Sequence, residues 1–127
     1  MTGRSSWIKL QLVGLTIFHE GDVAVVIPAG MLVGDAETRE LESELRRLIQ
    51  TGHRKILLDL GMTTYLSSNP IGVLIGVQVA AQTNGAAFHI CSAEKKIRNV
   101  LSLLQVIHVM HLFDSFDAAM RAFSRTR

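Results

Sequence analysis

The sequence predicts an α/β fold, a single domain in which a mixed sheet of about four to five strands packs against about four helices. The chain has 127 residues, which is the size of one domain, and 48% of them are hydrophobic, enough for a sizeable core. An early hairpin signal is followed by strand-like and helix-like segments that alternate to the end. Such alternation implies crossover connections and a mostly parallel sheet.

Three strand-like runs open the chain. Residues 7–13 ("WIKLQLV") alternate between apolar and polar side chains with the period of a strand. Residues 15–20 and 23–29 flank Gly21 and Asp22, which is a hairpin signal. Because "VAVVI" is apolar on both faces, we expect it to be a central, buried strand.

Residues 36–52 show the clearest helix pattern. Leucine and isoleucine side chains recur there at helical spacing, with charged residues on the opposite face. Asp35 is placed to cap the helix, and Gly52 is placed to end it. Residues 55–61 ("KILLDLG") then read as a short buried strand.

The segment "YLSSNPIGVLIGVQVAAQTNG", residues 65–85, has the composition of a strand but the beginning of a helix. Asn69 is a good N-cap residue, and Pro70 is favoured at the first helical position. We therefore predict a largely buried helix from there to about Asn84. Gly72 and Gly76 share one face, which predicts close packing of that face against the sheet.

Two further strand and helix pairs complete the chain. Residues 86–92 and 106–113 read as strands, and residues 93–104 and 116–125 read as amphipathic helices. Ser92 is expected to cap the first of these helices, and Asp114 or Ser115 the second.

Composition narrows the function classes. The net charge is +2 and the basic residues are scattered, so a nucleic-acid partner is not expected. No apolar run reaches the roughly 18 residues that span a bilayer, so direct membrane insertion is not expected either. The single Cys91 cannot form an internal disulfide, and residues 7–13 make a poor secretory segment, which together predict a cytoplasmic protein.

No pattern of residues points to a cofactor, a metal or a catalytic centre. His108 and His111 would face opposite sides of a strand, and His89 and Cys91 would share a face but are only two ligands, so neither pair predicts a metal site. Ser68 lacks a nucleophile-elbow motif, and Cys91 lies in an apolar strand. Ser67 and Ser68 can therefore be read in two ways, as loop residues that assist the start of a helix or as a phosphorylation site.

The chain resembles a STAS domain over about residues 15–124, with residues 1–14 as an N-terminal extension and 125–127 as a tail. The resemblance rests on "VAVVIPAG" before the first long helix, on "HRKILLDLGMTTYLSSNPIGVLIG", on "NGAAFHICSAEKKIRNVLSLLQV" and on "FDSFDAAMRAF". Anchoring on "IGVLIG" places Ser68 at the serine that a partner kinase phosphorylates in anti-sigma factor antagonists. Ser67, Asn69, Pro70 and Val33 differ from the acidic, hydroxyl or glycine residues that the family often carries at those places.

The resemblance implies a protein-interaction module without catalytic activity, which works by partner switching. Its implied partners are an anti-sigma factor that is also a serine kinase, and a serine phosphatase. Ser68 is then the candidate phosphoacceptor, and the candidate partner contacts are Met31, Leu32, Val33, Ser67, Ser68, Asn69, Pro70 and Ile71.

Two alternatives remain open. The chain could be a scaffold or accessory module that is never phosphorylated, in a sensory complex or beside a transporter, or it could sense a small ligand. The strand in residues 7–13 can be read as one more edge strand that closes the sheet. We hypothesise that it pairs instead with a second copy of the chain to form a homodimer, because an unpaired strand edge invites such pairing.

Overall fold

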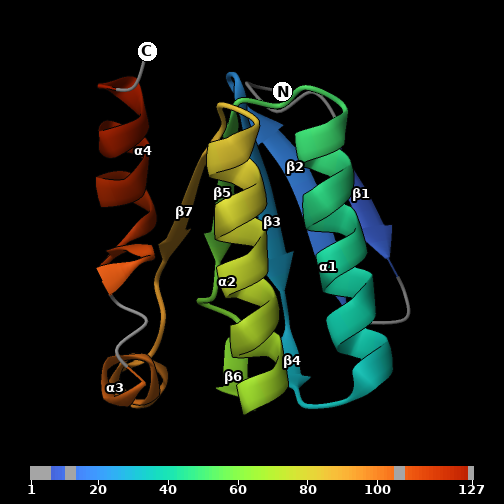
Figure 1. Cartoon of the computed structure of the whole chain (residues 1–127), viewed down its shortest axis with the longest axis vertical. Helices are drawn as coiled ribbons and strands as arrows, with labels where there is room; N and C mark the ends of the chain where they lie inside the picture. Colours follow the sequence, from blue (N-terminus) through green and yellow to red (C-terminus); the bar gives the residue numbers. More distant parts are fainter. Residues whose placement is uncertain (1–6, 11–13, 105–107, 126–127) are drawn as a thin grey trace.

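The computed structural model describes residues 7–10, 14–104 and 108–125. Strands and helices alternate along most of this chain (Figure 1). In chain order they are β1 (Trp7–Leu10), β2 (Leu15–Glu20), β3 (Val23–Pro28), β4 (Gly30–Leu32), α1 (Asp35–Gln50), β5 (Lys55–Asp59), β6 (Thr63–Leu66), α2 (Ser68–Thr83), β7 (Ala87–Cys91), α3 (Lys95–Leu103), β8 (His111–Phe113) and α4 (Phe116–Ser124).

The main sheet is mixed and has six strands in the order β1-β2-β3-β5-β7-β8. β1, β2 and β3 pair antiparallel, and the remaining neighbours pair parallel. The predicted α/β class, the hairpin and the central position of β3 are thereby confirmed. The extra strand beyond the expected four to five is β1, an edge strand that lies in the N-terminal extension. Its pairing with a second copy stays a prediction.

A second sheet of two parallel strands, β4 and β6, was not predicted. Its strands have three and four residues, too few to show a period in the sequence. β4 continues from β3 after Ala29, and β6 follows β5 after a turn. The small sheet therefore extends the carboxyl ends of two neighbouring strands, and it carries the loops that lead into α1 and α2 (Figure 1).

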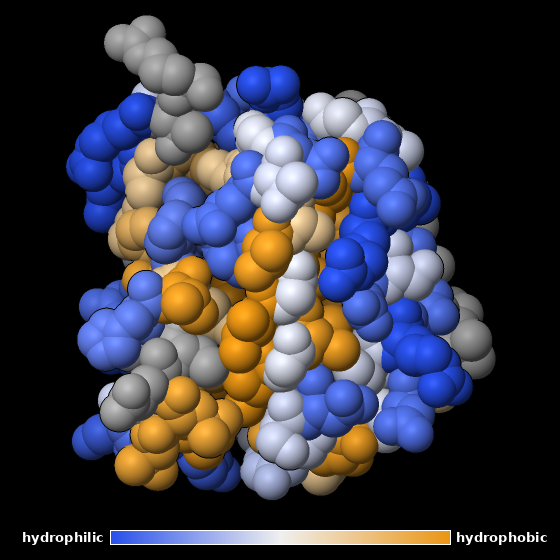
Figure 2. All heavy atoms as spheres, in the orientation of Figure 1, coloured by the Kyte–Doolittle hydropathy of each residue, from blue (hydrophilic) through white to orange (hydrophobic). Residues whose placement is uncertain are grey.

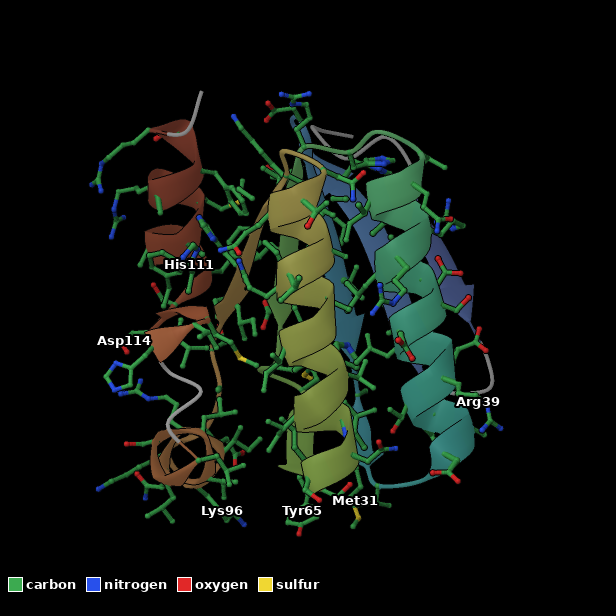
Figure 3. The ribbon with its side chains drawn as sticks, in the orientation of Figure 1. Met31, Arg39, Tyr65, Lys96, His111 and Asp114 are labelled. Atoms are coloured by element: carbon green, nitrogen blue, oxygen red, sulfur yellow. The ribbon has the colours of Figure 1, made fainter. Side chains whose placement is uncertain are left out.

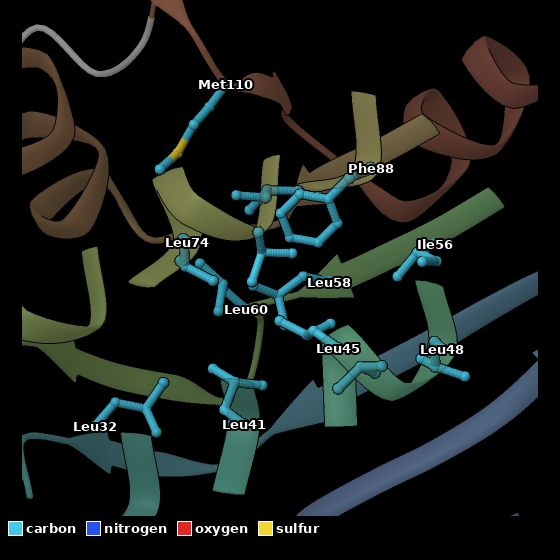
Figure 4. Packing of buried hydrophobic residues seen from close by; sticks show 14 of the residues in the cluster. Leu32, Leu41, Leu45, Leu48, Ile56, Leu58, Leu60, Leu74, Phe88 and Met110 are labelled. Carbon is cyan, nitrogen blue, oxygen red and sulfur yellow. The ribbon is translucent and has the colours of Figure 1, made fainter. Parts of the chain in front are cut away.

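Two apolar clusters hold the layers together. The larger one joins one face of the main sheet to α1, α2 and α3, and its members include Leu41, Leu74 and Phe88 (Figure 4). The smaller one lies on the other face, where α4 contributes Ala119 and Phe123. Alternating side chains of the central strands feed both clusters, which explains why these strands are apolar on both faces.

α1 begins one residue away from the predicted cap. Gly34 is its N-cap, and Asp35 is its first helical residue, where a carboxylate still favours the positive end of the helix dipole. The end of α1 is as predicted. Gly52, with φ of +93°, donates to the Ile49 carbonyl, and the amide of His53 donates to the Leu48 carbonyl, which together form a Schellman motif.

The prediction that Gly72 and Gly76 face the sheet is wrong. The buried face of α2 carries Leu74, Val77 and Ala81 instead. Gly72 is exposed, and a Cβ at position 76 would lie 3.1 Å from the guanidinium Nη2 of Arg46 on α1. The glycines thus face solvent and the neighbouring helix, so they are not needed for packing on the sheet.

We expect Gly72→Ala to raise the free energy of unfolding by about 0.5–1 kcal/mol, because alanine restricts the unfolded chain and favours the helix. A Cβ at this position meets no atom within 4 Å. Gly52→Ala is the matched control and should lower the same free energy by about 1–2 kcal/mol, since position 52 requires a left-handed backbone. Urea denaturation measures both. A loss of stability in Gly72→Ala would contradict this placement of the glycine.

The C-terminal elements differ from expectation in two places. Ser92 does not cap α3, because its φ is +66° and its amide donates to the Phe113 carbonyl; Glu94 is the N-cap. β8 is shorter than the predicted strand of residues 106–113, and residues 105–107 lie outside the described residues. Ser115 caps α4 by accepting from the Ala118 amide at 3.1 Å, which confirms that prediction.

His89 of β7 lies between the sheet and α4. Its ring stacks on Phe123 with centroids 4.1 Å apart, and its Nδ1 has no hydrogen-bond partner among the described residues. Burial lowers the pKa of His89 from the usual 6.5, the backbone of Phe88 partly opposes this shift, and nearby His111 adds to it. The folded protein therefore favours a neutral imidazole at this position.

Because the unfolded chain takes up this proton more readily, the contribution of His89 is fully present above pH 6.5 and is lost as the pH falls below it. We expect the free energy of unfolding to decrease from pH 7.5 to pH 5.5, a range that brackets the unperturbed histidine pKa of about 6.5. The decrease should be smaller in His89→Leu than in the wild type. Urea titrations of both proteins at the two pH values test this. Equal slopes in the two proteins would rule out His89 as the source.

Candidate functional site

The small sheet brings the two predicted contact loops together at the carboxyl edge of the main sheet. Met31 pairs with Tyr65, and Leu32 pairs with Leu66. The amide of Ser67 donates to the Leu32 carbonyl at 3.2 Å, so the ladder runs to the start of α2. The loop after β4 and the loop after β6 therefore lie side by side, as expected for parallel strands.

Buried polar contacts fix this small sheet to the rest of the domain. The hydroxyl of Thr63, which is fully buried, donates to the Pro28 carbonyl at 2.8 Å. The amide of Gly30, whose φ is +91°, donates to the Met62 carbonyl at 2.9 Å. These two bonds connect the beginnings of β4 and β6, so the loops beyond them start from a fixed position.

α2 begins earlier than the sequence suggested. Ser67 is the N-cap, in an extended conformation, and Ser68 is the first helical residue. Asn69 is therefore not the N-cap, and Pro70 is the third helical residue, where its missing N–H still costs no helical bond. The reason is that β6 ends at Leu66 and its ladder with β4 fixes the Ser67 amide, so the helix starts directly afterwards.

The first turn of α2 has an exposed serine hydroxyl and no acidic side chain beside the positive end of the helix dipole. The Ser67 side chain makes no cap hydrogen bond to the helix; its Oγ lies 3.5 Å from the Leu32 carbonyl oxygen. Ser68 is exposed, and the first turn contains no acidic residue. The positive end of the helix dipole is thus not balanced by a carboxylate of that turn, and an anion at position 68 would be favoured there.

Exposed apolar side chains lie on the two paired strands and loops that meet at the start of α2. Met31 is 58% exposed, Val33 is 47% exposed and Tyr65 is 44% exposed. Figure 3 shows Met31 and Tyr65 beside each other below the first turn of α2, both pointing away from the domain. We call the surface formed by Met31, Val33, Tyr65, Ser68 and Asn69 the docking surface.

Tyr65 was missed from the sequence, because the short strand that exposes it was read as a loop. Thr63 and Leu66 of β6 are buried and the two residues between them are exposed, a pattern without the period of a strand, so no sequence signal marks Tyr65.

Three of the predicted contact residues lie inside the domain. Leu32 is 1% exposed and Ile71 is 2% exposed, and both belong to the larger apolar cluster. Pro70 is also buried, whereas Ser67 is half-buried. These residues support the docking surface from beneath, and Met31, Val33, Ser68 and Asn69 form its outer part.

The docking surface carries no formal charge. Residues 29–34 and 61–71 contain no Asp, Glu, Lys, Arg or His. A phosphate on Ser68 would add a charge of about −2 to a surface that has none of its own. The change in surface potential would therefore be large, while the helix N-terminus could accommodate the phosphate without unfolding.

The described residues offer little support for other chemistry. Cys91 is buried, and burial raises the pKa of its thiol to about 11, so the unreactive protonated form predominates at neutral pH. Within the part of the chain that the structure covers, no group of three or more His, Cys, Asp or Glu side chains is arranged to hold a metal ion. None of the described helices is both long and apolar enough to cross a bilayer.

A second apolar region lies apart from the docking surface. Figure 2 shows hydrophobic residues over α2 and α3 and mostly polar residues over α1. The exposed members of this region include Val79, Leu103 and Leu104. They lie beyond the first turn of α2 and are not part of the surface around Ser68.

Comparison with known proteins agrees with this architecture. The family model of the STAS domain matches residues 17–119. The chain is 27% identical over 92 residues to BtrV of Bordetella bronchiseptica, which carries the name of an anti-sigma factor antagonist; the match covers 72% of this chain and 79% of BtrV.

Solved structures show the same fold. The structure of TM1081 from Thermotoga maritima superposes with a TM-score of 0.78 at 19% identity, covering 98% of each chain. The phosphorylated form of the Bacillus cell-fate determinant SpoIIAA superposes with a TM-score of 0.64 at 12% identity, covering 96% of this chain and all of that one. The family match spans most of the described domain, including both strands and loops of the docking surface. This chain therefore belongs to the STAS domain family.

Proposed function

We propose that this protein is an anti-sigma factor antagonist that works by partner switching. In its unphosphorylated form it binds an anti-sigma factor that is also a serine kinase, through the docking surface. The kinase phosphorylates Ser68, the complex dissociates, and a serine phosphatase restores the binding form. The protein is then a substrate of the kinase in the cytoplasm and has no catalytic role of its own.

The observation that carries this proposal is the position of Ser68. It is an exposed serine on the first turn of a helix, in the middle of an apolar and uncharged surface. Apolar side chains suit a protein partner, since an interface core is depleted in charge and enriched in aromatic residues and methionine. A phosphate in such an interface would lose water without gaining a counter-ion, which is unfavourable.

The names of the relatives support the same role. BtrV is named for anti-sigma factor antagonism, and SpoIIAA has been solved in a phosphorylated and an unphosphorylated form. The name and the phosphorylated structure describe these relatives and not this chain. For this chain they make a phosphorylation cycle the first hypothesis to test.

Intact-mass spectrometry of the protein isolated from its native cells tests the phosphorylation. We expect a fraction of the protein to carry one added phosphate, and fragmentation to place it on Ser68. A Ser68→Ala variant expressed in the same cells should lose the increment, while Ser67→Ala, the control, should keep it. A phosphate found on Ser67 or on no serine under any growth condition would contradict the assignment.

A second function is favoured by the lack of charge around Ser68. The family often carries acidic residues at the places of Ser67 and Val33, and this chain has none there. A surface of Met31, Val33 and Tyr65 would suit constitutive docking in a sensory complex or a transporter-associated assembly. Stable binding of a partner together with an unmodified Ser68 under all growth conditions would favour this scaffold role.

A further inference from the structure

We propose that His19 and His53 form a binding site for a borderline divalent transition-metal ion such as Zn²⁺. The two side chains come from distant parts of the chain. His19 lies in β2, and His53 lies in the turn between α1 and β5. The site is at the amino end of the parallel strands, opposite to the docking surface, and this proposal does not depend on the function of Ser68.

The distance between the two imidazole rings fits a shared ion. Their Nε2 atoms are 3.2 Å apart. Two ligands at 2.0–2.1 Å from a tetrahedral zinc ion are separated by about 3.3 Å, so only a small adjustment is needed. The ring centroids are 5.3 Å apart and the ring planes are inclined by 29°.

The second nitrogen of His53 is already held in the manner of a metal ligand. Its Nδ1 lies 3.2 Å from the Leu48 carbonyl oxygen and 3.1 Å from the Thr51 hydroxyl. In the tautomer with the proton on Nδ1, this nitrogen donates to the carbonyl, which can only accept. The Nε2 of His53 then carries a free lone pair. A metal-binding histidine usually donates its other ring N–H to a carbonyl or carboxylate in this way, which orients the ring.

The same geometry without an ion is a single N–H···N hydrogen bond. In the same tautomer His53 Nε2 carries no proton, and His19 Nε2 is the donor. Binding of a metal requires His19 to move its proton to Nδ1 and to present Nε2 as a lone pair. The two imidazoles need no further change to coordinate an ion as neutral ligands.

The pair supplies two ligands, and no third His, Cys, Asp or Glu among the described residues is placed to join them, so this site differs from a full protein metal centre and its remaining ligands would be water. A cavity of about 380 Å³ lies beside His53, lined also by Asp22, Thr51, Gly52 and Arg54. Two imidazoles favour Zn²⁺, Cu²⁺ or Ni²⁺ over Mg²⁺ and Ca²⁺, which prefer oxygen ligands. The bound ion would connect β2 to the end of α1, and it would stabilise the folded protein by mass action.

Isothermal titration of the tag-free, chelator-treated protein with Zn²⁺ tests the site. We expect one ion per chain, and at least about a tenfold loss of affinity in His19→Gln and in His53→Gln. His108→Gln is the matched control, because His108 is exposed and outside the pair, and it should bind zinc like the wild type. Mg²⁺ should give no binding heat.

Two results would overturn the proposal: no binding by the wild-type protein at millimolar Zn²⁺, or equal binding by all three variants. Should a variant fail to fold, the ring nitrogen signals of the wild-type protein decide. Zn²⁺ should shift the Nε2 resonances of His19 and His53 and leave those of His108 unchanged. Shifts confined to other histidines would exclude this site.

Discussion

Ser68→Glu should reduce the affinity of this protein for a kinase-type anti-sigma factor by about a hundredfold, while Ser68→Ala should bind like the unmodified protein. The carboxylate would be buried by the partner on a surface that has no counter-charge, at a cost of roughly 3 kcal/mol. Titration calorimetry or surface plasmon resonance with the purified partner measures the difference.

The controls separate this effect from a loss of folding. Ser68→Gln has nearly the same shape without the charge and should bind much more tightly than Ser68→Glu. The glutamate variant should also be at least as stable as the wild type, because a carboxylate in the first helical turn contributes about 0.3–1 kcal/mol through the helix dipole. Equal affinity of Ser68→Glu and Ser68→Gln would contradict the proposed switch.

Ile71→Ala should lower the free energy of unfolding by about 2–5 kcal/mol, while Val33→Ala should change it by less than about 0.5 kcal/mol. The sequence suggested both residues as partner contacts. Ile71 is 2% exposed and belongs to the larger cluster, so its truncation leaves a cavity, whereas Val33 is 47% exposed and its truncation leaves none. Chemical denaturation monitored by circular dichroism measures both values.

Substitution of Val33 should affect partner binding more than substitution of Ile71, the reverse of their effects on stability. Val33→Arg should weaken binding of the anti-sigma factor, whereas folded Ile71→Ala should bind close to normally under conditions that keep it folded. A destabilised Val33→Ala, or a fully stable Ile71→Ala, would show that the two side chains are not distributed between core and docking surface as described.

Most of the sheet and the helix order could be predicted because the relevant signals are local. The apolar spacing of α1 and the strand patterns of β3, β5 and β7 follow directly from helical and strand periods. Gly52 and Ser115 were placed correctly because their roles depend on a positive φ and on a hydroxyl cap, which one residue determines.

The parts that were missed depend on tertiary contacts. α2 has no charged residue, so its sequence does not distinguish the buried face from the exposed one, and Gly72 and Gly76 were assigned to the wrong side. The start of α2 is set by the ladder between β4 and β6, which pairs residues more than thirty positions apart. Tyr65 became a site residue only through that ladder.

The most direct test of partner switching compares two forms of the native sequence, one unmodified and one phosphorylated stoichiometrically on Ser68. Both are titrated against the same purified kinase-type anti-sigma factor. The account predicts that the unmodified protein binds, that the phosphorylated protein does not, and that treatment with a serine phosphatase restores binding. Equal binding of both forms, or failure of the kinase to modify Ser68 while it binds the protein, would contradict it.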